Sequence, residues 1–145
     1  MSQLFSPITI RDLEVSNRLW VSPMCQYSAI EGVVQYWHHV HLGAWAINKA
    51  GLIIAEATAV APEGRITPED SGLWNDEQEA AWKPILAFSH TQGVPMAIQL
   101  AHAGRKASTR SPFQEGEAVV MPGEGGWTPE APSAQAYEGL LEPAE

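Results

Sequence analysis

The side chains best suited to chemistry lie in one short stretch, Ser22-Pro23-Met24-Cys25-Gln26-Tyr27, which holds the only cysteine of the 145-residue chain. The residues before it, Arg18 to Val21, are typical of a short buried strand. That strand must end at Pro23, because proline has no N–H to donate to a ladder. In parallel α/β folds, ligands bind beyond the carboxyl ends of the strands. Met24 to Tyr27 are therefore candidates for a ligand site.

The cysteine of this stretch is a weak candidate for a nucleophile. A thiol with a pKa near 8.5 is only a few per cent thiolate at neutral pH. The sequence places no Lys, Arg or His within several residues of Cys25 to lower that pKa. Two interpretations stay open, namely a buried thiol that packs as a small apolar residue and a thiol that lies beside a cofactor.

Three histidines, His38, His39 and His41, stand near the start of a predicted helix, where His38 and His41 could share a face. That helix has no Glu, the chain has no second cysteine, and no His-Glu-x-x-His pattern occurs. We therefore favour packing or interface roles over a metal site. His102 follows a later strand and lies near the predicted ligand rim, although a loop histidine bonded to backbone explains it equally well.

Gln99 precedes the end of that later strand by two residues. An amide can donate and accept at once, which suits a flat heterocycle with alternating carbonyl and N–H groups. A core glutamine bonded to neighbouring backbone is the alternative. Gly-x-Gly-x-x-Gly, Walker and Gly-x-Ser-x-Gly motifs are absent from the sequence. Dinucleotide-fold dehydrogenases, P-loop enzymes and serine hydrolases are disfavoured for that reason.

The elements that must position these residues alternate as strand, helix, strand, helix, strand. A small hairpin precedes them, and periodicity predicts a helix from Trp37 to Ala50 that ends with Gly51 as its C′ residue. The almost unbroken apolar run from Leu52 to Ala61 is typical of a strand covered on both faces. The hairpin strands are expected at Ile8–Ile10 and Leu13–Val15.

The second helix is predicted from Asn75, because Gln78 three residues later completes a capping-box pattern. Pro84 falls inside it, so we expect a kink there or a later start near Trp82. The last strand is predicted from Val94 to Ala101. After it, prolines and glycines interrupt about forty residues with no periodicity, which indicates a long excursion over the ligand face.

Composition and charge exclude several classes of function. The formal net charge is −9, and residues 111–145 carry seven acids and no base. Because no basic patch could neutralise phosphates, we expect no nucleic-acid partner. The sequence has no membrane-length apolar run and no signal peptide at its start. Together with the single cysteine, this leads us to expect no membrane partner and a cytoplasmic location.

Three parallel strands and two helices leave both edges of a sheet open. The natural completion is a (β/α)8 TIM barrel of about 250 residues, of which this chain would be the amino-terminal portion, completed by residues not in this chain. We divide residues 1–145, as part of one barrel domain, into a hairpin cap (1–16), a βαβαβ unit (17–104) and an acidic, Pro/Gly-rich loop region (105–145).

A series of motifs closely resembles the old yellow enzyme family of FMN-dependent ene-reductases, and within it the cysteine-containing xenobiotic-reductase or thermophilic-like branch. The resemblance runs in order from about Leu4 to Tyr137. Each motif alone is weak, but the series is specific. It comprises Asn17-Arg18, Ser22 to Tyr27, Trp37-His38, Glu56 to Val60, Glu63 to Ile66, Ile98 to Lys106 and Ala131 to Ser133.

This resemblance implies an FMN enzyme in which NADPH or NADH reduces the flavin and the flavin reduces an activated alkene. The substrate classes that it implies are enones, enals, maleimides and nitro compounds. By the family pattern, Cys25 tunes the flavin and substrate affinity, and Tyr27 contacts the substrate. The residues that would bind the flavin are Pro23, Met24, Cys25, Ala57 and Gln99.

The resemblance covers only the amino-terminal part of the family pattern. In relatives, the proton donor, the residues that hold the substrate carbonyl and the phosphate-binding loops come from later strands. We therefore expect a second chain that carries the remaining barrel, a homo-oligomer of the completed unit, and an inactive isolated chain. A non-catalytic flavin-binding or regulatory fragment that docks on a full-length relative is the main alternative. A small histidine-metal hydrolase is the third.

Overall fold

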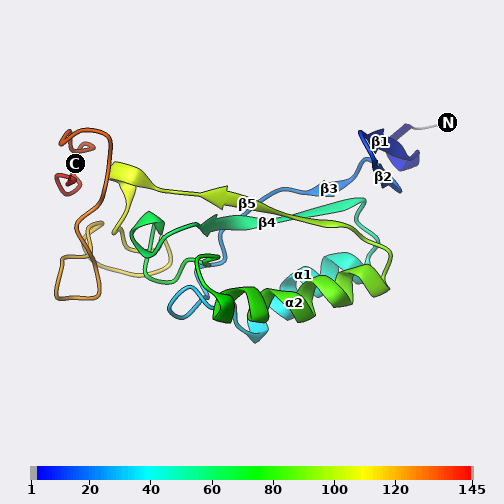
Figure 1. Cartoon of the computed structure of the whole chain (residues 1–145), viewed down its shortest axis with the longest axis horizontal. Coiled ribbons are helices and arrows are strands. Elements are labelled where there is room, and N and C mark those ends of the chain that lie inside the picture. The colour runs from blue at the N-terminus through cyan, green and yellow to red at the C-terminus, as the bar shows by residue number, and fades with distance from the viewer. Residues whose placement is uncertain (1–2, 145) are drawn as a thin grey trace.

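Two helices and three parallel strands alternate along the central part of the chain (Figure 1). The structure is a computed structural model that describes residues 3–144. The first two residues of the predicted cap and the last residue of the predicted loop region lie outside the described residues. The central elements are β3 (Trp20–Val21), α1 (Tyr36–Ile47), β4 (Leu52–Ala59), α2 (Asp76–Thr91) and β5 (Met96–Ala101).

The sheet has the order β3-β4-β5, and every neighbouring pair is parallel. Both helices lie on the same side of it (Figure 1). The core fills the space between them and the sheet, where Ile53 of β4 is completely buried beside Leu42 of α1 and Ile85 of α2. This repeated strand–helix arrangement confirms the predicted start of a (β/α)8 barrel, with the sheet still open.

A separate antiparallel hairpin, β1 (Ile8–Ile10) with β2 (Leu13–Val15), lies at the end of the molecule where the chain begins (Figure 1). Its strands have the predicted bounds, although Ile10 and Leu13 next to the turn are exposed. A single-turn helix, Gln3–Phe5, precedes it. The Arg18 N–H, just before the sheet, donates to the Leu4 carbonyl of this single-turn helix over 2.9 Å.

The strands are shorter and more open than the sequence predicts. β3 covers only Trp20–Val21, and the predicted burial of this strand is wrong for Leu19, which is 54% exposed. Leu100 of β5 is also 63% exposed, and both β3 and β5 are edge strands with no outer neighbour among the described residues. Only β4, which has a strand on each side, is buried along its length.

Helix α1 ends three residues earlier than predicted, at Ile47. The left-handed residue after it is Lys49, with φ 61°, so the prediction of Gly51 as the C′ residue is wrong. Gly51 has another role. A Cβ there would lie 2.2 Å from the carbonyl oxygen of Asn17, so only glycine lets these two backbone segments approach.

Helix α2 begins where the capping pattern predicts, since the Asn75 side chain accepts from the Gln78 N–H over 3.0 Å. The Gln78 amide oxygen reaches the Trp74 N–H instead of the cap residue itself, which extends the capping by one residue. The alternative start near Trp82 is wrong. Pro84 lies on the exposed side within one continuous helix, where water can bond to the carbonyl that it leaves free.

The long segment after β5 folds back on the β4–α2 loop. Arg65 of that loop lies between two indole rings, with its guanidinium carbon 5.6 Å from the centre of Trp74 and 4.7 Å from that of Trp127. The Trp127 indole N–H also donates to the Glu63 carbonyl over 2.9 Å. These contacts hold the acidic segment at the carboxyl ends of the strands. No helix among the described residues is long and apolar enough to cross a membrane.

Candidate functional site

The carboxyl halves of β4 and β5 bring Ala57 and Gln99 directly opposite each other. The register contains a bulge there, because Ala55 pairs with Ile98 and Ala57 with Gln99, which leaves Glu56 as an extra residue on β4. A bulge re-aims the side chains next to it. Here it leaves Ala57 half-buried, while Glu56 is buried.

The loop after β3, Ser22 to Tyr27, lies next to this pair, and we call it the cysteine loop. The Cys25 sulfur is held by the backbone of Ala57 and by the Tyr27 side chain, so the loop lies against the end of β4. Pro23 is half-buried and Met24 is 49% exposed. The structure therefore brings together the predicted residues Cys25, Ala57 and Gln99, which come from three successive strands.

Burial is the main reason that the pKa of the Cys25 thiol rises from 9.0 to about 11. The carboxylates of Asp70 and Glu56 raise it further, because a thiolate beside two negative charges is disfavoured. The contacts with Ala57 and Tyr27 lower the pKa by less. Cys25 is thus a protonated thiol at neutral pH, as expected for a residue that is not a nucleophile.

Tyr27 is held in a strained conformation at the end of this loop. Its φ of 49° lies in the left-handed region, which bulky residues rarely occupy. Burial raises the pKa of the phenol, and the nearby Cys25 raises it further. The ring makes an edge-to-face contact with Phe113, whose centre lies 5.7 Å away. Strain of this kind persists where the surroundings fix the residue, and it is concentrated at functional sites.

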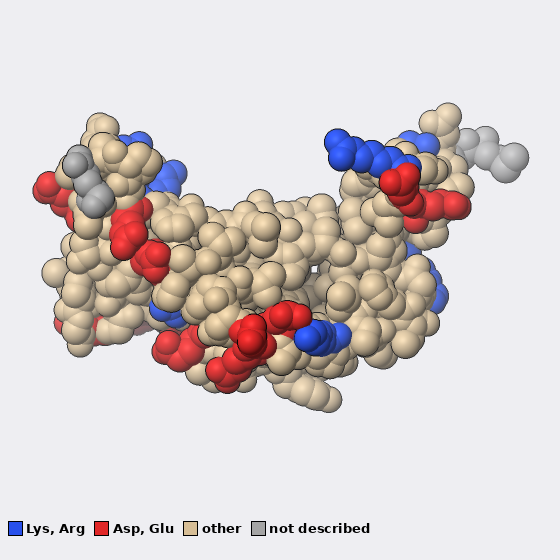
Figure 2. Space-filling model, viewed as in Figure 1, with Lys and Arg blue, Asp and Glu red and all other residues tan. Residues whose placement is uncertain are grey.

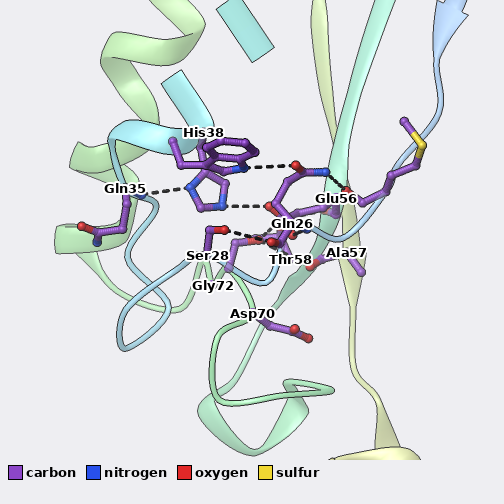
Figure 3. A network of polar contacts seen from close by, with 12 residues as sticks. Gln26, Ser28, Gln35, His38, Glu56, Ala57, Thr58, Asp70 and Gly72 are labelled. Atoms are coloured by element: carbon purple, nitrogen blue, oxygen red, sulfur yellow. Dashed lines mark hydrogen bonds and ion pairs between the residues drawn. The ribbon is translucent and has the colours of Figure 1, made fainter. Parts of the chain in front are cut away.

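A buried polar network lies behind the cysteine loop (Figure 3). Glu56 Oε1 lies 2.9 Å from His38 Nε2, and Glu56 Oε2 accepts from the Gln26 N–H over 2.7 Å. The contact with His38 is short, although it is not aligned as a linear hydrogen bond. The His38 Nδ1 atom accepts from the Gln35 N–H over 3.0 Å at the start of α1. One carboxylate thus links β4, α1 and the loop.

The histidines have structural partners in this arrangement. Among the residues that the structure describes, no group of three or more His, Cys, Asp or Glu side chains is placed to hold a metal ion. His38 is buried against Glu56, whereas His41 stacks on Trp37 at a centre-to-centre distance of 6.2 Å. His102 Nδ1 accepts from the Gly104 N–H over 3.1 Å, which is the backbone-bonded alternative.

The sequence pattern did not indicate that Glu56 and Asp70 are buried and that both influence the pKa of Cys25. Asp70 is 2% exposed and accepts from Thr67 Oγ1 and the Ile66 N–H, each over 2.8 Å. Burial raises its pKa above the ordinary value. A carboxylate inside an otherwise apolar strand is the signal that could have identified Glu56, because buried charges require partners. Asp70 lies in a loop without such a signal.

The face of the sheet away from the helices is open and suits a flat polar ring. Gln99 is exposed there and is not the buried core amide of the alternative interpretation. Its amide can both donate and accept. Ala57 between Gln99 and the cysteine loop has a side chain too small to obstruct a ring. The surface over this part of the molecule carries few charges and is hollowed between two raised ends (Figure 2).

The sequence is similar to known flavin oxidoreductases. An NADH:flavin oxidoreductase of Gibberella zeae is 47% identical over 144 residues, which cover 98% of this chain and 35% of that protein. An NADPH dehydrogenase of a Geobacillus species is 45% identical over 108 residues, covering 73% of this chain and 32% of that protein. The chain therefore spans about a third of the length of these relatives.

Solved structures of the same family share the fold. Morphinone reductase in complex with tetrahydroNAD superimposes with a TM-score of 0.77 at 32% identity, over 97% of this chain and 35% of that chain. The old yellow enzyme from a Pichia species gives a TM-score of 0.69 at 31% identity, over 73% of this chain and 28% of that chain. The sequence profile of one family matches residues 3–138. The chain belongs to the NADH:flavin oxidoreductase / NADH oxidase family, which includes the old yellow enzymes.

Proposed function

We propose that this chain supplies one wall of the FMN site in an NAD(P)H-dependent ene-reductase. The observation that carries the proposal is that Ala57 pairs directly with Gln99 near the carboxyl ends of β4 and β5, and that the Cys25 sulfur, in the loop after β3, contacts the Ala57 backbone. Ligands of barrel enzymes bind at this end of the sheet. The names of the relatives support a flavin and a nicotinamide donor.

The chemistry of the donor set fits a flavin ring. The exposed Gln99 amide matches the alternating carbonyl and N–H groups of a pyrimidine edge, while Met24 and Ala57 offer apolar surface to the ring face. When bound, FMN would supply hydride transfer from NAD(P)H to the β-carbon of an activated alkene. Enones, enals, maleimides and nitro compounds are the substrate classes proposed.

In this proposal, the residues of this chain bind the flavin ring and orient it and the substrate. Gln99 would hold the ring in its plane, Pro23 and Met24 would line its face, and Tyr27 would contact the substrate oxygen. Cys25, held as a neutral thiol, would tune the electronics of the ring instead of attacking the substrate. Glu56 and Asp70 keep a negative field behind that thiol.

The rest of the barrel would provide the opposite wall and the proton donor. Leu19 and Trp20 of the β3 edge, and Leu100 of β5, expose apolar side chains on the two open edges of the sheet. Those are the edges at which a (β/α)8 barrel closes. A second polypeptide with the matching two thirds of a family member is the proposed partner, and a homo-oligomer of the completed unit is the proposed assembly.

The proposal is tested by co-expressing the chain with that complementary part and recording the visible absorption spectrum of the purified complex. We expect a yellow complex that consumes NADPH when an enone is added. A colourless complex would refute the proposed function, whereas bound FMN without turnover would favour the non-catalytic fragment.

Two variants then test the residue roles within that complex. Gln99→Ala should weaken FMN binding about fivefold, since it removes hydrogen bonds worth about 1 kcal/mol. Gln135→Ala, in the exposed loop, is the matched control. Cys25→Ser should shift the flavin reduction potential and leave FMN bound, so loss of FMN in this variant would contradict the tuning role.

A further inference from the structure

One buried carboxylate controls the position of the cysteine loop. Glu56 is 4% exposed, and its two oxygens reach two different elements, His38 on α1 and the Gln26 N–H in the loop. The Gln26 N–H belongs to the peptide bond that joins Gln26 to Cys25. The Glu56 carboxylate therefore binds the peptide group that directly follows the Cys25 side chain along the backbone.

Gln26 passes this constraint to the rest of the loop. Its side-chain Nε2 donates to the Met24 carbonyl over 2.8 Å, and its Oε1 accepts from the Trp37 indole N–H over 3.1 Å. Figure 3 shows Gln26 between Glu56 and the start of α1. The backbone from Met24 to Gln26 is thus bonded at both ends, at the Met24 carbonyl and at the Gln26 N–H that Glu56 accepts from.

His38 in turn fixes the carboxylate. Because His38 Nδ1 accepts from the Gln35 N–H, the imidazole is neutral and its proton is on Nε2, which faces Glu56. The ring cannot turn without breaking the cap of α1. Only 1% of the His38 side chain is exposed, so water does not compete for this contact.

A packing role alone does not explain a carboxylate at this position. An apolar residue would fill the same space without the free-energy cost of burying a charge. The bulge also leaves residue 56 without a paired partner on β5. The buried charge and the lost strand pairing both occur at Glu56, whose side chain binds the cysteine loop.

We propose that His38 and Glu56 are positioning residues that orient the Cys25–Gln26 peptide, and with it the thiol, toward the flavin. The inference rests on the proposed function, because the flavin is what the loop would be oriented toward. Neither residue is proposed to touch the flavin or the substrate. Their effect is exerted through Gln26.

The orientation is measured on the 145-residue chain without flavin, by hydrogen exchange of the Gln26 amide in NMR spectra. Glu56→Ala should accelerate exchange at Gln26 about tenfold or more, because a charge-assisted hydrogen bond to that amide is lost. Glu79→Gln is the control, since Glu79 is an exposed carboxylate paired with Lys83 on α2. Equal acceleration across the core amides of β4 would mean general destabilisation and would overturn the proposal.

Two substitutions of His38 separate its contact with Glu56 from its cap on α1. His38→Gln retains a donor near the Nε2 position, and His38→Asn retains an acceptor near the Nδ1 position. We expect slow Gln26 exchange to survive in His38→Gln and to be lost in His38→Asn. The reverse order would show that His38 acts only as a helix cap.

The Cys25 thiol gives a second readout that packing would not move. The charge of Glu56 raises the pKa of Cys25, so Glu56→Gln should lower that pKa, measured as the pH midpoint of alkylation, while burial and the charge of Asp70 keep it above the ordinary value. An unchanged midpoint would overturn the proposal. A chain that shows these effects but binds no FMN in the complex would refute the proposed function and leave the loop orientation established.

Discussion

The reactivity of Cys25 gives a direct test of the site. The pKa of the thiol is about 11 instead of 9.0, so the thiolate fraction at pH 7.5 is lower than that of an ordinary thiol by about 100-fold. Intrinsic nucleophilicity rises with pKa, with a Brønsted slope of about 0.4–0.5, and this recovers about tenfold. The net rate should therefore be about tenfold slower at neutral pH.

The rate is measured with a small aromatic disulfide reagent over a range of pH, monitored by absorbance. The reference is a double variant, Cys25→Ser with Ala136→Cys, because Ala136 is exposed in the loop region. We expect the rate of Cys25 to rise up to about pH 11 and that of the reference thiol to level off near pH 9. Equal rates and equal midpoints would refute the reasoning, since the loop would not then enclose the thiol.

The other predictions concern the free energy of unfolding and the surroundings of the tryptophans. Because the pKa of Cys25 is raised in the folded state, its contribution to the unfolding free energy is complete below pH 9.0 and lost as the pH rises through about 11. Urea titrations at several pH values should show a smaller alkaline loss in Cys25→Ser than in the wild type, because burial also raises the pKa of Tyr27 and that contribution remains. Gly51→Ala should cost about 1–3 kcal/mol in the same assay, because its Cβ would overlap the Asn17 carbonyl; an unchanged midpoint would contradict the close approach. Asn75→Ala should cost about 1 kcal/mol by loss of the α2 cap, and Asn75→Asp should retain most of it. Arg65→Ala should change the tryptophan fluorescence and lower stability by about 1 kcal/mol, whereas a spectrum identical to wild type would show that the indoles do not depend on the guanidinium.

Local patterns in the sequence were enough to predict the order of the elements. The apolar run of β4, the alternation of the hairpin and the cap at Asn75 are each properties of a few neighbouring residues. Helix ends were less predictable. The left-handed conformation at Lys49 is imposed by the return of the chain toward the sheet, and residue type alone would place it at Gly51.

The candidate site was predicted only as far as strand ends and motifs allow. Cys25 and Gln99 follow from their places near the ends of strands, Ala57 follows from the family resemblance, and the pairing of Ala57 with Gln99 follows from parallel strands. The bulge at Glu56 depends on the register between β4 and β5, which single-strand alternation does not contain. The burial of Asp70 depends on how its loop folds over β4, so no local pattern indicated it.

The bulge in β4 has a consequence for how the strand could tolerate insertions and deletions. Without Glu56, Ala55 and Ala57 would be consecutive and would pair with the consecutive Ile98 and Gln99 of β5. The strand would then alternate regularly, and Ala57 would keep its face of the sheet. Glu56 is in this sense an inserted residue that adds a carboxylate without shifting the phase of its neighbours. Insertion or deletion of one codon at this position would therefore add or remove the carboxylate, while Ala57 would stay paired with Gln99.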